Sequence, residues 1–203
     1  MKKVKNMPWI AFLGADGSGK STTIDHLTDF LNDQRIEVSY HHWRPVISDN
    51  KQAGSPVYDP HAKPRRGAPV STARLFILLG VWWVSYVRDL SPLRKRGKFI
   101  IFDRFYADLL VDPQRYRYGG SRLLASCLFR LMPKPSLVML LDAEAEVLYH
   151  RKPEVELHKL KQIVADYRKY IASIAHGVLI NSDQNVERVI SDVVREVESV
   201  LSE

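Results

Sequence analysis

The chain alternates between short apolar segments and stretches of helical spacing. Segments 9–13, 36–41, 98–102, 137–141 and 178–180 have the length of strands, and most of them are continuous apolar runs. A strand that is apolar on both sides needs cover on both sides, which is typical of a parallel sheet. The sequence therefore predicts an α/β fold in three layers, with a parallel sheet of five strands flanked by helices.

Between these strands, apolar residues recur at intervals of three and four, as along one face of a helix. Helices are expected after Lys20 to about residue 31, and over about 70–89, 121–131, 143–151 and 156–175. A last amphipathic helix begins at about 186. Cys127 lies beside Leu124 and Leu128 in one of these patterns, so we expect it in the core.

Segment 42–70 interrupts the pattern. It is rich in proline and glycine and shows almost no periodicity. A loop of this length inside a compact domain is usually functional or disordered. A chain of 203 residues suffices for one ordinary domain, so residues 1–203 are expected to form a single domain with an irregular insertion at about 42–70.

Basic residues outnumber acidic ones by 30 to 23, which gives a net charge of +7. Such an excess attracts anions, whether nucleotides, phosphosugars, nucleic acid or acidic membranes. The apolar run 75–87 is shorter than the roughly 20 residues of a membrane span, and no secretory signal is recognised, so no membrane association is expected. A single cysteine favours a reducing compartment, and we expect a cytoplasmic protein.

Residues 14–21, GADGSGKS, match G-x-x-x-x-G-K-[ST] at every fixed position, between an expected strand and an expected helix. In such a loop the backbone N–H groups turn inward around phosphate oxygens, and the helix N-terminus adds positive potential. Lys20 would reach the β- and γ-phosphates of ATP, and Ser21 would offer its hydroxyl to Mg²⁺. The residues expected to bind ATP are Gly14, Gly17, Ser18, Gly19, Lys20, Ser21 and Thr22.

Further segments resemble the thymidylate kinase family of P-loop nucleoside monophosphate kinases. Residues 96–105, RGKFIIFDRF, are similar to the family's Arg-Gly, hydrophobic strand and Asp-Arg-aromatic signature. Residues 141–151, LDAEAEVLYHR, resemble the strand and helix that lead into its lid, and 180–182, INS, also match. The resemblance covers most of the chain except 45–70 and 106–132. It implies a P-loop NTPase fold and an ATP-dependent phosphotransferase with Mg²⁺ as cofactor.

The resemblance also implies roles for charged residues. In the family the Asp-Arg pair, here Asp103 and Arg104, follows a strand adjacent to the strand that precedes the phosphate loop. Asp103 would help to hold Mg²⁺ through water, and Arg104 would clamp the acceptor phosphate, which a planar guanidinium binds bidentately. Arg44 resembles the arginine of the family's Arg-Glu-Pro segment, which also contacts the acceptor phosphate, although the glutamate is missing here. Asp16 would contact the acceptor sugar.

The expected lid is short and spans about 151–161. Pro153 follows Arg151 and Lys152, and the arginine-rich segment of the family is shortened here. Gly17 stands where some members place a catalytic arginine. The transition-state cation is therefore expected to be Arg151, with Lys152 as the second candidate.

The base-recognition residues of the family are largely absent. Counting back from Pro92, Trp82 falls where the family carries a thymine-contacting arginine, so Trp82 is expected at the acceptor. Asp108 is also expected there, and it or Asp112 would act as general base if the acceptor is a hydroxyl. The loop 112–118, rich in arginine and tyrosine, would line the site of an anionic substrate or a nucleic-acid surface.

The predicted function is Mg²⁺-ATP-dependent phosphoryl transfer to a small, phosphorylated acceptor by a thymidylate kinase-like nucleotide kinase. The first alternative is a kinase of the same fold that acts on a sugar or another non-thymidylate acceptor. The second alternative is a P-loop ATPase that binds nucleic acid, although nucleic acid is not the expected partner. By resemblance, the apolar helix 75–87 would pack against a second copy in a homodimer.

Overall fold

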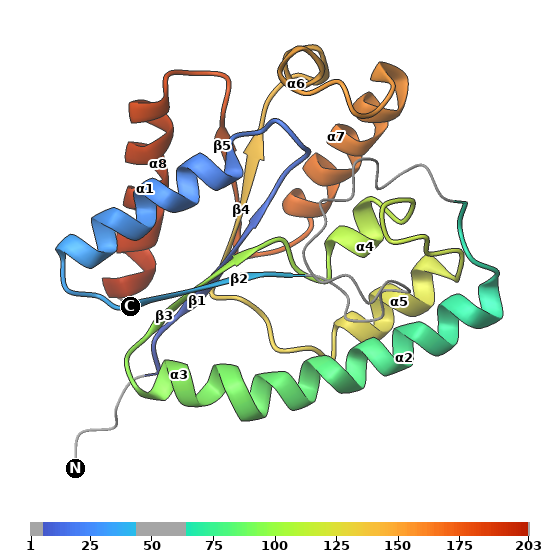
Figure 1. Ribbon diagram of the computed structural model, residues 1–203, viewed down its shortest axis with the longest axis horizontal. Coiled ribbons are helices and arrows are strands. Elements are labelled where there is room, and N and C mark those ends of the chain that lie inside the picture. Colours follow the sequence, from blue (N-terminus) through green and yellow to red (C-terminus); the bar gives the residue numbers. More distant parts are fainter. Residues whose placement is uncertain (1–5, 44–63, 203) are drawn as a thin grey trace.

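The computed structural model describes residues 6–43 and 64–202. Its strands form one parallel sheet in the order β2-β3-β1-β4-β5 (Figure 1). Their bounds are β1 Trp9–Leu13, β2 Val38–His42, β3 Phe99–Asp103, β4 Leu137–Asp142 and β5 Gly177–Asn181. The three central strands are almost wholly buried, and the edge strands β2 and β5 are partly exposed. The predicted five-stranded parallel sheet is confirmed.

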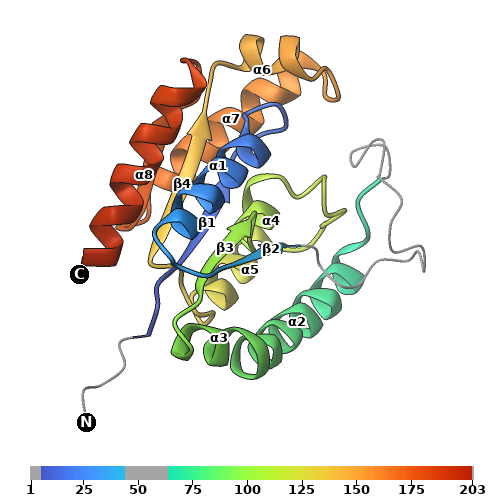
Figure 2. The same ribbon diagram turned by 60° about the vertical axis from the view of Figure 1, so that its left-hand side comes forward.

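Helices cover both faces of the sheet (Figure 2). The helices α1 (Lys20–Asp33) and α8 (Val186–Ser202) pack on one face, where their buried residues meet Ile10 and Phe12 of β1. The opposite face, with Trp9 and Ala11, is covered chiefly by α2 (Ala68–Ser85), α5 (Arg122–Phe129) and α7 (Leu157–Ala172). Successive side chains of a strand point to opposite faces, so one buried strand serves both cores.

Two further helices, which follow strands, are short. The helix α6 (Ala145–Arg151) follows β4, and α4 (Asp108–Val111) follows β3. With four residues, α4 is too short to leave a periodic signal, and the sequence did not predict it.

The helix α2 continues beyond its expected end. A π-helical turn, Tyr86–Leu90, follows it directly and leads into α3, Ser91–Lys95. Pro92 lacks an N–H group and its ring crowds the carbonyl one turn earlier, so it normally ends or bends a helix. The π turn lies just before the proline, and in it the Ser91 N–H donates to the Tyr86 carbonyl, five residues earlier. This wider turn accommodates Pro92 without a break in the helix.

The continuous helix 68–95 is also long and apolar enough, by length and composition alone, to cross a membrane. Its most apolar window has a mean hydropathy of 1.5, and 22% of that window is buried. One such helix is weak evidence for a membrane span, because core helices pass the same test. The inner side of α2 buries Leu75, Leu78 and Trp82.

Cys127 is exposed, so the prediction that it lies in the core is wrong. The helix α5 turns Ala125 and Phe129 toward the core, one turn apart. Cys127 lies two residues from each, and residues two apart on a helix point in different directions.

Candidate active site

The phosphate loop joins β1 to α1, and its glycines are required by the backbone. Gly14 has φ of +143°, and a Cβ there would lie 2.6 Å from Ser18 Oγ and 2.8 Å from the Leu141 carbonyl oxygen. Gly17 has φ of +84°, in the left-handed region. A residue with a Cβ rarely adopts this backbone conformation, so a substitution there would be strained. An arginine at Gly17 would be strained there, which fits the departure from the family at this position. Ser21 and Thr22 are exposed in the first turn of α1.

Lys20 folds back over the loop. Its Nζ donates to the carbonyl oxygens of Gly14 at 2.8 Å and Ala15 at 2.9 Å. Burial lowers the pKa of Lys20 to about 7, and the charge of Arg104 acts in the same direction, against the opposing carboxylate of Asp16. An incoming phosphate would favour the charged ammonium again.

Asp103 ends β3, the strand next to β1, and stands opposite Phe12. This position agrees with the expectation from the resemblance that an aspartate ends the strand beside the phosphate loop. Its Oδ2 lies 3.0 Å from Nδ1 of His42 and accepts from the Tyr40 hydroxyl at 3.4 Å. Its Oδ1 is buried and has no hydrogen-bond partner within the described ranges.

Asp103 is ionised. Burial alone would raise the pKa of its carboxyl, but the His42 contact and the charges of Lys20 and Arg104 hold the pKa below its ordinary value. A carboxylate with a buried, unpartnered oxygen beside a phosphate loop suits a hard divalent cation. Asp103 and the hydroxyl of Ser21 therefore fit Mg²⁺.

Arg104 is the centre of a buried network. Its Nη2 donates to Asp16 Oδ1 at 2.7 Å, and its Nη1 donates to Asp108 Oδ2 at 2.7 Å and to the Tyr167 hydroxyl at 3.2 Å. The residue is 3% exposed and has φ of +66°, unusual for a side chain of this size. Such a conformation persists only where the surroundings hold it, and this network does so. It ties the phosphate loop to α4 and α7.

Asp108 is fully buried on the far side of Arg104. Its Oδ1 accepts from the Tyr167 hydroxyl at 2.9 Å, and its Oδ2 accepts from the Tyr116 hydroxyl at 3.1 Å as well as from Arg104. Burial raises the pKa of both tyrosines well above the usual range, so they remain neutral donors. In this arrangement Asp108 fixes the position of Arg104.

Asp16 is held by two arginines, because Arg115 Nη1 also donates to its Oδ2, at 2.6 Å. Burial opposes ionisation, but the charges of Arg104, Arg115 and Lys20 keep the pKa of Asp16 well below its usual range. From the sequence, Arg115 was expected only as a member of an arginine- and tyrosine-rich loop, with no role of its own. Tyr167 was missed entirely, since only its helical spacing is visible in the sequence.

The two lid candidates lie beside the phosphate loop. A Cβ on Gly17 would be 3.4 Å from the Cβ atoms of both Arg151 and Lys152. The guanidinium of Arg151 donates to the Ser182 carbonyl at 3.2 Å and to Asp183 at 3.5 Å. Lys152, by contrast, lines the same pocket as Asp16, Arg104 and Arg115.

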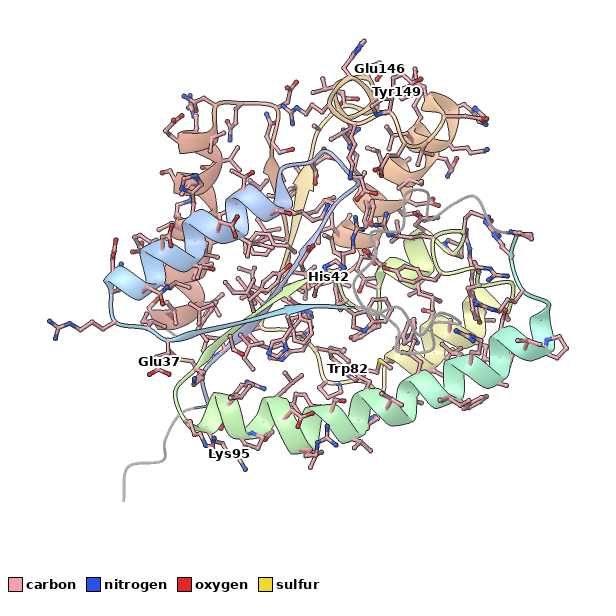
Figure 3. The ribbon with its side chains drawn as sticks, in the orientation of Figure 1. Glu37, His42, Trp82, Lys95, Glu146 and Tyr149 are labelled. Carbon is pink, nitrogen blue, oxygen red and sulfur yellow. The ribbon has the colours of Figure 1, made fainter. Side chains whose placement is uncertain are left out.

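Trp82 lies on the inner side of α2 (Figure 3), where its indole ring packs near Trp9, Phe102 and Tyr106. It is 6% exposed and lines neither of the two pockets described in this section and below. The structure thus brings Asp16, Arg104 and Asp108 together and leaves Trp82 within the core. The predicted contact by Arg44 falls outside the described residues.

A phosphate loop at the end of the first strand, with an Asp-Arg pair closing the neighbouring strand, defines a P-loop phosphotransferase. The family model for thymidylate kinase matches residues 12–202. The chain belongs to the thymidylate kinase family, and it is an ATP-dependent nucleotide kinase by that membership.

The similar proteins cover between 74% and 95% of the chain. The thymidylate kinase of Symbiobacterium thermophilum is 27% identical over 214 residues, which cover 95% of this chain and 94% of that protein. A probable thymidylate kinase of Archaeoglobus fulgidus is 24% identical, with 95% and 96% covered. A thymidylate kinase of Rickettsia bellii is 27% identical, with 74% and 71% covered. The predicted family and fold are confirmed, and the sugar kinase and nucleic-acid ATPase alternatives are not favoured.

Proposed function

We propose that this protein uses Mg²⁺-ATP to phosphorylate the phosphate group of a small acceptor, with thymidylate as the first candidate. The observation that carries the proposal is the buried Arg104, held by Asp16 and Asp108 directly beside the phosphate loop. An arginine fixed in this way is suited to bind a phosphate group through donors other than Nη1, which Asp108 and Tyr167 occupy. The names of the similar proteins support thymidylate as the first acceptor to test.

On the donor side, the loop 14–19 and the first turn of α1 would hold the triphosphate of ATP, with Lys20 on the β- and γ-phosphates. Ser21 and Asp103 would hold the metal ion. When bound, Mg²⁺ neutralises charge that develops on the phosphate oxygens.

On the acceptor side, Arg104 and Arg115 both reach the pocket that Asp16 lines. We propose that the two arginines bind the acceptor phosphate, with Arg44 as a further contact, while Asp16 meets the acceptor sugar. A phosphate is already a nucleophilic anion, so no aspartate base is needed in this scheme. Catalysis would come from positioning and charge neutralisation.

The lid cation is the remaining part of the machinery. We propose that residues 151–161 act as the lid and that Lys152 supplies the positive charge, since it lines the pocket of Arg104. Arg151, the first candidate from the sequence, becomes the second, because it is not among the described residues that line this pocket. Lys152 itself pairs with Glu154, which lines the same pocket, at 3.0 Å.

A coupled assay of ADP release tests the proposal. Nucleoside monophosphates and phosphosugars are compared with the matching unphosphorylated nucleosides and sugars. We expect turnover only with phosphorylated acceptors, no turnover with Lys20→Ala, and a loss of about 100-fold or more in kcat with Arg104→Lys. Turnover of an unphosphorylated acceptor, or ATP hydrolysis that depends on added nucleic acid, would contradict it.

The outer side of α2 supports the homodimer. The exposed large apolar side chains on this side of α2 and the π turn are Val70, Phe76, Ile77, Val81, Trp83, Val84 and Val87. We propose that a second copy covers this side, in a cytoplasmic protein. Sedimentation at micromolar concentration should show a dimer that Val84→Lys dissociates and that Leu131→Lys, an exposed control just beyond the C-terminal end of α5, does not. A wild-type monomer, or one that binds lipid vesicles instead, would refute the dimer.

A further inference from the structure

The carboxylate of Asp103 has hydrogen-bond partners on one oxygen only, within the part of the chain that the structure describes. His42 Nδ1 lies 3.0 Å from Oδ2, and the Tyr40 hydroxyl donates to the same oxygen at 3.4 Å. Both partners belong to β2. The other oxygen, Oδ1, is buried and has no partner among the described residues. One side of the carboxylate is therefore held by the neighbouring strand, and the other side is left for a ligand.

The parallel sheet itself brings His42 to this carboxylate. His42 stands opposite Asp103 in the ladder between β2 and β3, at the end of both strands (Figure 3). The next N–H group of the chain, that of Trp43, donates to the Asp103 carbonyl at 3.0 Å. Tyr40 precedes His42 by two residues, so the two side chains point to the same face of the sheet. The contact is thus built into regular backbone pairing.

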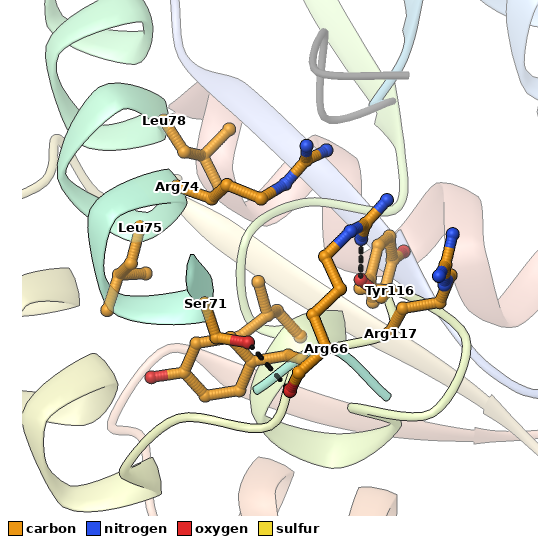
Figure 4. Close-up of a pocket in the computed structure, with 9 residues that line it drawn as sticks. Arg66, Ser71, Arg74, Leu75, Leu78, Tyr116 and Arg117 are labelled. Atoms are coloured by element: carbon orange, nitrogen blue, oxygen red, sulfur yellow. Dashed lines mark hydrogen bonds between the residues drawn. The ribbon is translucent and has the colours of Figure 1, made fainter. Parts of the chain in front are cut away.

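The end of β2 is also anchored by a ring contact. Trp43 is 5% exposed and meets Tyr116 edge to face, with the ring centroids 5.2 Å apart. Tyr116 lines a second pocket, between the first turns of α2 and the loop that follows α4 (Figure 4). Its hydroxyl donates to Asp108 at 3.1 Å. Trp43 therefore holds the end of β2, and His42 with it, against the body of the protein.

His42 donates the hydrogen in its contact with Asp103. The aspartate is ionised, and an ionised carboxylate can only accept, so Nδ1 of the imidazole carries the hydrogen. The His42 side chain is 33% exposed, whereas that of Asp103 is 10% exposed. The histidine is therefore not a core residue, and its most evident contribution is this hydrogen bond.

We propose that His42 is a positioning residue of the metal site, whose Nδ1–H holds Oδ2 of Asp103 and so keeps Oδ1 available to Mg²⁺. The inference rests on the proposed function, in which Asp103 and Ser21 hold the ion. Without the hydrogen bond the carboxylate could rotate, and ordering it on metal binding would cost conformational free energy. Partners of this kind typically contribute 10- to 100-fold to metal affinity. Tyr40, at its longer distance, would contribute less.

Binding of Mn²⁺ tests the proposal without turnover, because this ion can replace Mg²⁺ and its free form is measured by electron paramagnetic resonance. The ion is titrated into the full-length protein saturated with β,γ-imido-ATP, an analogue that is not hydrolysed. We expect His42→Leu to raise the Kd of Mn²⁺ by about 10-fold. His42→Asn, whose amide places an N–H near the position of Nδ1, should raise it by less than about 3-fold.

The adjacent histidine provides a matched control. His41 points to the other face of the sheet, where its ring stacks on Phe102 with the centroids 5.1 Å apart and its Nε2 lies 3.0 Å from Ser39 Oγ. His41→Leu should leave the Kd of Mn²⁺ unchanged. The affinity for β,γ-imido-ATP without metal, measured by calorimetry, should be the same in His42→Leu and the wild type, since His42 contacts the carboxylate and not the phosphate loop.

A Kd of Mn²⁺ that His42→Leu leaves unchanged would overturn the proposal. An equal loss in His42→Leu and His42→Asn would also overturn it, because the hydrogen-bond donor would then be irrelevant. A matching loss of metal-free nucleotide affinity would do the same, because His42 would then support the phosphate loop as a whole.

Asp103→Asn separates this failure from that of the proposed function. If Asp103→Asn weakens Mn²⁺ binding and His42→Leu does not, the positioning role falls and the metal site stands. If neither variant weakens it, Asp103 is not at the metal site and both fall. If Mn²⁺ affinity depends on both residues while no acceptor supports ADP release, the positioning role stands and the proposed reaction falls.

Discussion

Arg104 and Asp108 form a buried ion pair four residues apart, with Nη1 of the arginine 2.7 Å from Oδ2 of the aspartate. Their side chains are 4% and 0% exposed. The second nitrogen of the same guanidinium contacts Asp16 in the phosphate loop. The pair therefore fixes the position of the Arg104 guanidinium relative to the phosphate loop.

Asp108→Asn should lower the free energy of unfolding by about 3 kcal/mol, because it leaves the buried Arg104 charge with one anionic partner fewer. It should also raise KM for the acceptor, since Arg104 loses its fixed position. Urea denaturation and steady-state kinetics measure both effects, with the exposed Asp25→Asn on α1 as control. A loss of kcat alone, without a loss of stability, would indicate instead that Asp108 is a general base.

Nucleotide binding should take up a proton above pH 7. Burial holds the pKa of Lys20 at about 7 in the free protein, so at pH 8 its amine is mostly neutral. The phosphates of ATP favour the ammonium form and raise this pKa, which draws a proton from solution on binding.

Calorimetry of Mg²⁺-ATP binding in buffers of different ionisation enthalpy measures this proton. At pH 8 we expect uptake of close to one proton, falling as the pH is lowered below 7. The arginine of Lys20→Arg stays charged throughout this pH range, so this variant should bind Mg²⁺-ATP without taking up a proton. Equal uptake by the wild type and this variant would show that the proton goes elsewhere.

The lowered pKa of Lys20 also makes the free energy of unfolding depend on pH. Between about pH 7 and the ordinary pKa of 10.5, the unfolded chain binds a proton at Lys20 that the folded chain does not. The contribution of Lys20 to stability therefore rises with pH across this window.

Asp103→Asn should raise the Mg²⁺ concentration for half-maximal activity by about 10- to 100-fold, because a neutral amide replaces the carboxylate beside the metal site. A Mg²⁺ titration at fixed ATP measures it. Asp89→Asn, beside Arg88 on the far end of the long helix, provides a control with the same change of charge. An unchanged titration would exclude Asp103 from the metal site.

Trp82→Ala should lower the free energy of unfolding by about 3–5 kcal/mol, since it leaves a cavity beside Trp9 and Phe102. Leu123→Ala on α5, where the side chain is exposed, should change it by less than about 0.5 kcal/mol. Urea denaturation compares the two. The acceptor KM of Trp82→Phe, which keeps an aromatic ring in the core, measures whether the indole also contacts the acceptor.

The parts of the structure that local sequence determines were predictable. The strands appear as apolar runs because they are buried on both faces, and the phosphate loop is recognisable because its glycines and Lys20 have fixed spacing. The Asp-Arg pair was placed correctly because the resemblance supplied the neighbouring strand. Each of these signals lies within about ten consecutive residues.

Contacts between distant segments were not predictable in the same way. Arg115 meets Asp16 across 99 positions of the chain, and Tyr167 meets Asp108 across 59. Their pairing depends on how α4 and α7 pack on the sheet, which no local pattern records. The continuation of the helix past Pro92 depends likewise on a π turn that propensity does not reveal.

Asp16 belongs to the phosphate loop, yet both of its carboxylate oxygens are bound by Arg104 and Arg115, the arginines that we propose for the acceptor phosphate. A movement of the loop on ATP binding would thus be transmitted to Arg104 and Arg115 through one side chain. Thermodynamic reciprocity then requires that any factor by which ATP changes the affinity for the acceptor is matched by the factor by which the acceptor changes the affinity for ATP. Through this one aspartate, ATP and the acceptor would bind cooperatively rather than independently.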